Sequence, residues 1–195
     1  MGCRLKNGIE SVFATPIYFA SINNVIDVKK EFDEVKNKLT FFDTPEMWGR
    51  PQKLTTQNFE DDIIENKNMK VIGKVIDENL KIFLDAINFP EKKYRTTSWI
   101  TSNSKGEYSP VHNHLNADIS GVYYYQSNEK DGSIFFVTPT LAMTNSIFTK
   151  FSENIYVKPE EGKLLMFPGW LQHGVTTNMT DNNRISLAFN IYFEE

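Results

Sequence analysis

The three histidines of this 195-residue chain are the residues whose type and spacing are best suited to chemistry. His112 and His114 flank a single asparagine, and His173 follows 61 residues after His112. In a β-strand, residues i and i+2 point to the same face with Cα atoms about 6.5–7 Å apart, so two imidazoles can converge on one metal ion. A histidine from a distant strand would complete one face of the coordination sphere and leave the opposite positions open. We therefore predict a metal site formed by His112, His114 and His173.

A second pair of residues with matched spacing begins eleven residues after His173. Arg184 and Ser186 stand at i and i+2, so a strand would present a guanidinium and a hydroxyl on one face. A guanidinium can bind a carboxylate through two parallel hydrogen bonds, and a neighbouring hydroxyl can add a third. This pair would suit the far end of a buried dicarboxylate. The alternative is that Arg184 forms a surface ion pair after the turn at 181–183.

The hydrophobic pattern of the first half predicts the elements that support these residues. Apolar residues spaced by three or four indicate amphipathic helices over 25–39 and from about 68 to 87. Residues 12–20, interrupted by a proline, indicate a short edge strand. Residues 41–62 carry prolines and a glycine among polar residues, so we expect a long surface connection that could close over a substrate.

In the second half the pattern alternates, with turn residues about every ten positions, which predicts a β unit. We expect eight short strands, at 94–103, 111–114, 119–126, 133–137, 155–157, 163–167, 173–176 and 184–193. This number suits a jelly roll. The predicted fold is mainly β, with N-terminal helices packed on one sheet. We expect a single domain over 1–195, in which 1–90 supports a jelly-roll core at 91–195 that carries the metal site.

Composition and charge restrict the partners and the location. Lys and Arg number 21 against 25 Asp and Glu, and no short run is rich in Lys or Arg, so we expect no nucleic-acid partner. No run of 18 apolar residues occurs and the first residues lack an apolar stretch, so we expect neither a membrane span nor secretion. Cys3 is the only cysteine, which excludes an intrachain disulfide and fits the reducing cytoplasm.

Four motifs, taken in order, resemble the 2-oxoglutarate- and Fe(II)-dependent oxygenases. The motifs are Pro110-Val111-His112-Asn113-His114, Ser120-Gly121-Val122-Tyr123-Tyr124-Tyr125, the segment 162–173, and Arg184-Ile185-Ser186. The resemblance covers 94–193 strongly and 12–18 more loosely. It points to a subfamily found in marine bacteria and their phages, related to the prolyl hydroxylases.

The resemblance implies an activity, cofactors and a partner class. The fold would be a double-stranded β-helix with Fe(II) in its mouth. The co-substrate would be 2-oxoglutarate, which chelates the iron through its 2-oxo acid end, and molecular oxygen would be the oxidant. The reaction would oxidise a C–H bond, usually by hydroxylation, in a small-molecule or peptide substrate. The protein would hold the metal and orient the co-substrate.

The resemblance also implies a role for each candidate residue. His112 resembles the first iron ligand, and His173 resembles the distal histidine. Arg184 resembles the residue that pairs with the remote carboxylate of 2-oxoglutarate, and Ser186 resembles its hydroxyl helper.

One tyrosine of the second motif would reach the same carboxylate, as in the prolyl hydroxylases. This residue would be Tyr124 if Ser120, Val122 and Tyr124 face inward. If the strand were one residue out of phase, Tyr123 and Tyr125 would face inward instead.

The chain departs from the family pattern at the carboxylate ligand, because His114 stands where the common motif has Asp or Glu. We favour His114 as the third ligand. The alternatives are a site with two protein ligands, or Asp118 bound after a sharp turn. The missing negative ligand changes the redox balance of the site. An active oxygenase therefore competes with two alternatives, a non-catalytic jelly-roll binding module and a three-histidine, cupin-like dioxygenase that does not use 2-oxoglutarate.

Overall fold

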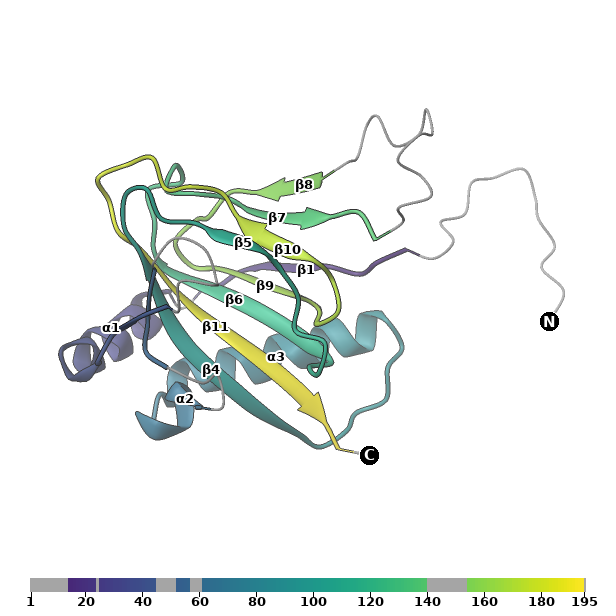
Figure 1. The fold of residues 1–195 in the computed structure, drawn as a ribbon. Coiled ribbons are helices and arrows are strands. Elements are labelled where there is room, and N and C mark those ends of the chain that lie inside the picture. The colour runs from purple at the N-terminus through teal and green to yellow at the C-terminus, as the bar shows by residue number, and fades with distance from the viewer. Residues whose placement is uncertain (1–13, 24, 45–51, 57–60, 140–153, 195) are drawn as a thin grey trace, which may run out of the picture.

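Two antiparallel β-sheets face one another, and the helices pack against one of them (Figure 1). The computed structural model describes residues 14–23, 25–44, 52–56, 61–139 and 154–194. In chain order the elements are β1 (Tyr18–Ser21), α1 (Val25–Val35), η1 (Lys36–Lys38), β2 (Phe42–Asp43), β3 (Lys53–Leu54), α2 (Ile63–Asn66), α3 (Lys70–Ala86), β4 (Tyr94–Asn103), β5 (Ser109–His112), β6 (Ile119–Gln126), β7 (Ile134–Val137), β8 (Asn154–Val157), β9 (Lys163–Pro168), β10 (His173–Val175) and β11 (Arg184–Phe193).

The larger sheet has the strand order β1-β9-β6-β11-β4-β3-β2. Its centre is the pair β4 and β11, which runs from Tyr94 opposite Phe193 to Asn103 opposite Arg184. On the other side of β11, strand β6 places Tyr124 opposite Ser186. The start of β11 therefore lies between the end of β4 and the second half of β6.

The smaller sheet has the order β5-β10-β7-β8. In the centre of this sheet, His173 of β10 lies opposite His112 of β5 on one side and Phe136 of β7 on the other. Two histidines that are 61 residues apart in the sequence are therefore neighbours across one strand pair.

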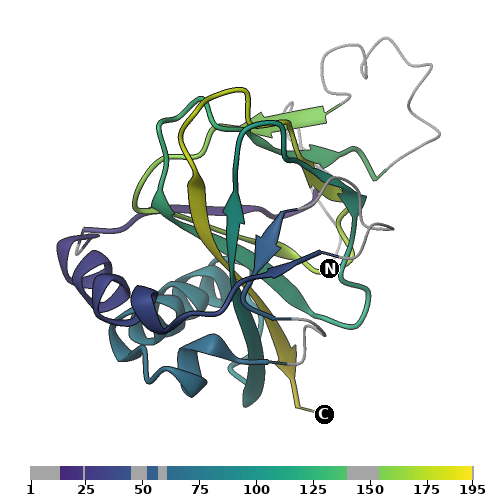
Figure 2. The same ribbon diagram turned by 60° about the vertical axis from the view of Figure 1, so that its left-hand side comes forward.

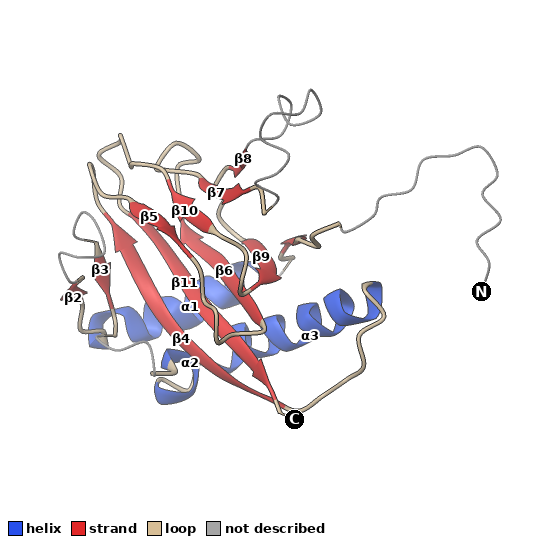
Figure 3. Ribbon diagram, turned by 45° about the vertical axis from the view of Figure 1, so that its right-hand side comes forward, coloured by secondary structure: helices blue, strands red, loops and turns tan. Residues whose placement is uncertain are grey.

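The helices cover the outer face of the larger sheet, as Figures 2 and 3 show. Every third or fourth residue of α3 is buried, so one apolar stripe of the helix packs on the strands. On each strand every second side chain points to the helices and joins this core, among them Ile100, Tyr123, Tyr125, Leu187 and Phe189. No helix in the described part of the chain combines the length and the apolar character needed to cross a bilayer.

A smaller apolar cluster lies between the two sheets. Tyr124 of β6 and Leu165 and Phe167 of β9 pack there with Ile134 and Phe136 of β7. This cluster fills one part of the space between the sheets, and the candidate site occupies another.

The predicted mainly β jelly roll with helices on one sheet is confirmed. The strands predicted at 94–103, 119–126 and 184–193 have the predicted ends. The helix expected at 25–39 is shorter, because α1 ends at Val35 and a 3-10 turn continues only to Lys38. The edge strand expected at 12–20 begins at Tyr18 and lies at the edge of the larger sheet, while residues 12 and 13 lie outside the described residues.

The interpretation of 41–62 as a surface connection was wrong in part. Its described residues include the hairpin β2–β3, which extends the larger sheet because Leu54 pairs with both Phe42 and Thr101. Two-residue strands lack the alternation by which strands are recognised in a sequence. Residues 45–51 and 57–60 of this segment lie outside the described part of the structure.

The strand predicted at 111–114 was also misplaced, because β5 covers 109–112. The chain leaves the sheet after His112 and turns, with the amide of Ala117 donating to the carbonyl of His114 at 2.8 Å. His114 is therefore a loop residue, and its own amide is fixed by the carbonyl of Gly169 at 2.8 Å.

Candidate metal centre and the cavity around it

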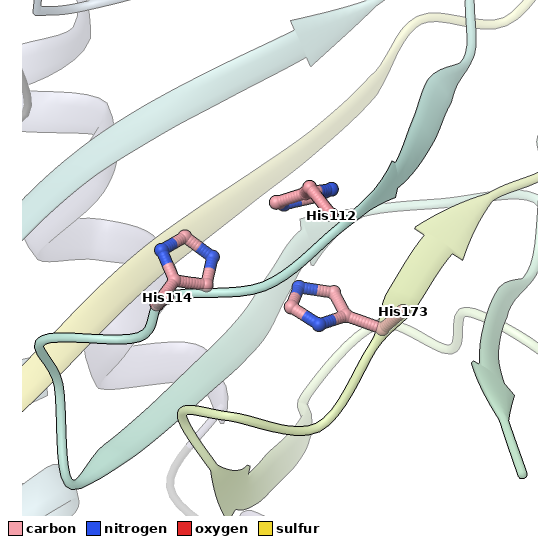
Figure 4. Close-up of side chains that lie close together, drawn as sticks. All are labelled: His112, His114 and His173. Atoms are coloured by element: carbon pink, nitrogen blue, oxygen red, sulfur yellow. The ribbon is translucent and has the colours of Figure 1, made fainter. Parts of the chain in front are cut away.

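The three histidines converge on one point, although only two of them lie in strands. Their nearest ligand nitrogens all lie within 4.8 Å of one another. Figure 4 shows His112 at the end of β5, His114 on the loop that follows it, and His173 at the start of β10. A single ion could contact all three nitrogens from this position.

Backbone carbonyls set the tautomer of two of the rings. Nδ1 of His112 lies 2.9 Å from the carbonyl oxygen of Pro110, and Nδ1 of His173 lies 2.8 Å from that of Leu171. A carbonyl only accepts, so each Nδ1 carries the hydrogen and each Nε2 keeps its lone pair. Metal-ligating histidines in proteins are held in the same way.

The protein around the rings keeps all three imidazoles neutral. Burial lowers the pKa of His173 to about 3, and the neighbouring His112 and His114 lower it further against the effect of its backbone hydrogen bond. Burial, followed by repulsion from His112, lowers the pKa of His114 to about 4. Loss of water around the ring also lowers the pKa of His112. Neutral imidazole is the form that binds metal, and it suits iron, nickel, copper and zinc.

No carboxylate joins this cluster in the described part of the chain. The Asp118 carboxylate, one of the predicted alternatives, instead accepts a hydrogen bond from the amide of Phe193 at 2.8 Å. It holds the end of β11 to the start of β6. Among the alternatives for the third ligand, the geometry therefore favours His114.

A cavity of about 570 Å³ opens beside the histidines. Strands β4, β6 and β11 of the larger sheet form one wall, and β5 and β10 of the smaller sheet form the other. All six residues singled out from the sequence line it: His112, His114, Tyr124, His173, Arg184 and Ser186. The fold thus gathers into one space residues that come from four separate motifs.

Arg184 is held by backbone and side-chain acceptors at one end of this cavity. It is 3% exposed, and its Nη1 donates to the carbonyls of Gly132 at 2.8 Å and Asp131 at 3.3 Å. Nη2 donates to Oδ1 of Asn103 at 2.8 Å. Nε is buried without a hydrogen-bond partner in the described structure. A guanidinium has five hydrogens, so the Nε hydrogen and one Nη2 hydrogen remain for a ligand.

Two hydroxyls lie near this guanidinium. Ser186 and Tyr124 face each other across β11 and β6, and both residues are buried and line the cavity. Burial raises the pKa of Tyr124 to about 12, partly opposed by the Arg184 charge, so the phenol keeps its hydrogen. Tyr123 and Tyr125 belong instead to the core beneath the helices. The inward register is therefore that of Ser120, Val122 and Tyr124.

Residues 97–190 match the sequence profile of a family of 2OG-Fe(II) oxygenases, where 2OG stands for 2-oxoglutarate. The match runs from within β4 to within β11 and includes all six site residues that were predicted from the sequence. Over this segment the chain is similar to the 2OG-Fe(II) oxygenase family. This similarity indicates an oxidoreductase that uses Fe(II) and 2-oxoglutarate. No curated protein matches the sequence.

Solved structures share the fold of this chain at low sequence identity. A prolyl-4-hydroxylase from Pseudomonas putida has a TM-score of 0.62 and 12% identity, over 93% of this chain and 94% of its own. HygX from Streptomyces hygroscopicus, with nickel and 2-oxoglutarate bound, has a TM-score of 0.62 and 14% identity, over 91% and 83%. An oxidoreductase of the 2OG-Fe(II) oxygenase family from Burkholderia pseudomallei has a TM-score of 0.61 and 14% identity, over 84% and 77%.

Reasoning from the sequence missed two polar residues of this candidate site. Asn103 receives the Nη2 hydrogen bond of Arg184, and Gln52 lies behind Asn103 on the same cavity. Neither belongs to a recognisable motif. Asn103 meets Arg184 only because β4 pairs with β11 in one register, which joins residues 81 positions apart.

Proposed function

We propose that this chain is a 2-oxoglutarate- and Fe(II)-dependent hydroxylase in which three histidines hold the metal. The observation that carries the proposal is one cavity with neutral imidazoles on its wall and a buried, partly unpaired guanidinium in it. The metal ligands are His112, His114 and His173. When bound, Fe(II) would supply the redox chemistry of the family, in which 2-oxoglutarate and O2 give succinate and CO2 and the second oxygen atom enters the substrate.

The charge of the site suits a dicarboxylate. A divalent ion on three neutral imidazoles keeps both of its positive charges, whereas a carboxylate ligand would remove one. Arg184 adds a third positive charge inside the cavity. The two negative charges of 2-oxoglutarate would offset most of this positive charge.

Arg184, Ser186 and Tyr124 would bind the remote carboxylate of 2-oxoglutarate. The free Nε and Nη2 hydrogens of Arg184 can form the paired hydrogen bonds that a guanidinium offers a carboxylate. The hydroxyls of Ser186 and Tyr124, which line the same cavity, can donate to the same oxygens. Binding would therefore satisfy a buried N–H group that has no partner in the described structure.

The remainder of the cavity is suited to an uncharged substrate. Arg184 is the only charged side chain among the residues described as lining it. Trp99, Ser120 and Asn190 line it as well, and Ser120 Oγ donates to Asn190 Oδ1 at 2.8 Å. Because the Asn190 side-chain oxygen accepts this hydrogen bond, the Asn190 amide nitrogen remains to donate to a ligand in the cavity. We propose a small molecule, or the side chain of a peptide, with an oxygen acceptor near the reacting carbon.

The fold neighbours are consistent with both substrate classes. One is a prolyl-4-hydroxylase, and another, HygX, has been solved with hygromycin B bound. We also propose a cytoplasmic location, because the only cysteine of the chain, Cys3, cannot form an intrachain disulfide.

Anaerobic titration of the metal-free protein with Fe(II) and 2-oxoglutarate tests the proposal. We expect the weak visible charge-transfer band of an iron–2-oxo acid chelate in the wild type. His173→Ala should raise the Fe(II) Kd by more than about 100-fold, beyond the roughly 10–100-fold cost of removing an outer-shell partner. Arg184→Met should raise the 2-oxoglutarate Kd by about 10–100-fold, since it removes hydrogen bonds from a charged donor.

Lys74→Ala is the control, because this exposed residue on α3 lies far from the cavity. Bound iron without the band would favour a three-histidine dioxygenase that does not use 2-oxoglutarate. The absence of iron binding would favour a non-catalytic jelly-roll module.

A further inference from the structure

A chain of hydrogen bonds links Arg184 to the β2–β3 hairpin. Arg184 Nη2 donates to Asn103 Oδ1 at 2.8 Å, and Asn103 Nδ2 donates to Gln52 Oε1 at 2.8 Å. The same Gln52 oxygen accepts from Ser109 Oγ of β5 at 3.0 Å. Asn103 is completely buried, and all four residues line the cavity. These hydrogen bonds therefore connect the guanidinium to the hairpin through side chains that are not exposed.

The chemistry of arginine fixes the direction of every bond in this chain. A guanidinium only donates, so Asn103 must turn its oxygen to Arg184 and its NH2 group away. Gln52 must then offer its oxygen to Asn103, and the same oxygen can take the Ser109 hydroxyl. Only one arrangement of the two amides satisfies all three bonds.

Gln52 is itself anchored in the hairpin. Its carbonyl accepts from the amide of Thr44 at 3.1 Å, and its amide donates to Thr44 Oγ1 at 3.2 Å. Thr44 is buried. Gln52 directly precedes β3, which pairs with β4, the strand that ends at Asn103. The hairpin thus places the Gln52 side chain at a defined point of the cavity.

We propose that Gln52 and Asn103 are positioning residues for the co-substrate. They hold Arg184 so that its Nε and one Nη2 hydrogen face the remote carboxylate of 2-oxoglutarate. The inference rests on the proposed function, in which Arg184 binds that carboxylate. It makes the β2–β3 hairpin part of the co-substrate site, although neither strand belongs to the jelly-roll core.

Removing the Gln52 acceptor leaves the Asn103 NH2 group buried without a partner. The Asn103 amide can then rotate to find another partner, and Arg184 loses the fixed acceptor on Nη2. The metal ligands lie on β5, the loop after it and β10, and none of the three imidazoles takes part in these hydrogen bonds. The expected effect is therefore confined to the end of the co-substrate that Arg184 binds.

The test measures metal and 2-oxo acid binding by calorimetry with Mn(II), which does not turn over. Gln52→Met keeps the side-chain length and removes the acceptor, and we expect the 2-oxoglutarate Kd to rise about fivefold to tenfold. The Mn(II) Kd should stay within twofold of wild type. The affinity for 2-oxobutyrate, which lacks a remote carboxylate, should also be unchanged.

Two further variants separate positioning from a general structural effect. Gln52→Glu keeps an oxygen for both donors but adds a negative charge, so its 2-oxoglutarate Kd should lie between those of the wild type and Gln52→Met. Lys53→Ala changes an exposed residue of the same hairpin and should have no effect. A Gln52→Met protein with wild-type 2-oxoglutarate affinity would overturn the inference. Equal losses for 2-oxoglutarate, 2-oxobutyrate and Mn(II) would overturn it too, because they would indicate a general disturbance.

Failure of the proposed function would look different. In that case the wild-type protein itself would bind 2-oxoglutarate no more tightly than 2-oxobutyrate in the presence of Mn(II).

Discussion

At the scale of single residues, His114 distinguishes this site from the common His-x-Asp or His-x-Glu pattern. Its ring lies with its centroid 5.4 Å from that of His173 and 5.1 Å from that of His112. A neutral third ligand raises the formal charge of the metal site by one relative to a carboxylate. That charge should affect the affinity for an anionic co-substrate more than the affinity for the metal.

His114→Asp tests this effect. The variant should still bind Mn(II), because two histidines and a carboxylate form a well-populated ligand set. Its 2-oxoglutarate Kd should rise by about threefold to tenfold as one positive charge is lost beside the dianion. Isothermal titration at low and high salt measures both constants. A lower Kd for 2-oxoglutarate in the variant would contradict the charge argument.

At the scale of elements, β6 separates the site from the helical core by simple alternation. Its residues Ser120, Val122 and Tyr124 line the cavity, while Tyr123 and Tyr125 pack under the helices. A shift by one residue would exchange the two faces. The close packing of Gly121 against Phe189 helps to fix the register between β6 and β11.

Gly121→Ala should destabilise the protein. A Cβ at position 121 would overlap the ring of Phe189, which faces it across β6 and β11 and is 1% exposed. Overpacking of this kind costs about 1–3 kcal/mol of unfolding free energy, measurable by urea denaturation.

Gly73→Ala on α3 is the matched control for this substitution. There the added Cβ would lie 3.3 Å from Ile64 Cγ2, and alanine favours a helix by about 0.5–1 kcal/mol. We expect a small change of either sign. A Gly121→Ala protein as stable as Gly73→Ala would show that Phe189 can move aside.

At the scale of the whole molecule, the helices and the jelly roll share one core. Phe32 of α1 stacks on Tyr125 of β6 with ring centroids 4.3 Å apart, and Tyr18 of β1 lies 5.7 Å from Phe83 of α3. The helices between 25 and 86 cover apolar strand residues that would otherwise face water. We propose that the two halves of the chain fold as one unit.

Thermal unfolding of the metal-free protein should therefore show one transition by both circular dichroism and tryptophan fluorescence. Mn(II) at 100 times its Kd should stabilise the folded state by about 2.7 kcal/mol and raise the Tm, and a chelator should reverse the shift. Two separate transitions would indicate that the helical half folds independently of the jelly roll.

Much of this architecture could be predicted from the sequence, because long strands leave a clear pattern. Strands β4, β6 and β11 are eight to ten residues long and rich in β-branched and aromatic residues, and their ends were predicted correctly. The hairpin β2–β3 was missed because two-residue strands carry no alternation. The convergence of three histidines was predicted from their spacing, but the position of His114 on a loop depends on its bond to Gly169.

The contacts around Arg184 could not be predicted in the same way. They depend on the register of β4 against β11 and on backbone carbonyls at Asp131 and Gly132, whose positions come from a turn. No property of the individual residues encodes that pairing.

The pairing of His112 with His173 gives the metal a structural role as well, because an ion bound to both would link two strands. The two residues lie opposite each other on β5 and β10, and β5 is an edge strand of the smaller sheet. An ion bound to both would close a loop of about 60 residues, a length at which cross-links restrict the unfolded chain strongly. A chain with a single cysteine has no intrachain disulfide to do this. In such a protein the catalytic ion would also hold the smaller sheet of the jelly roll together. The supply of iron would then set the lifetime of the folded protein.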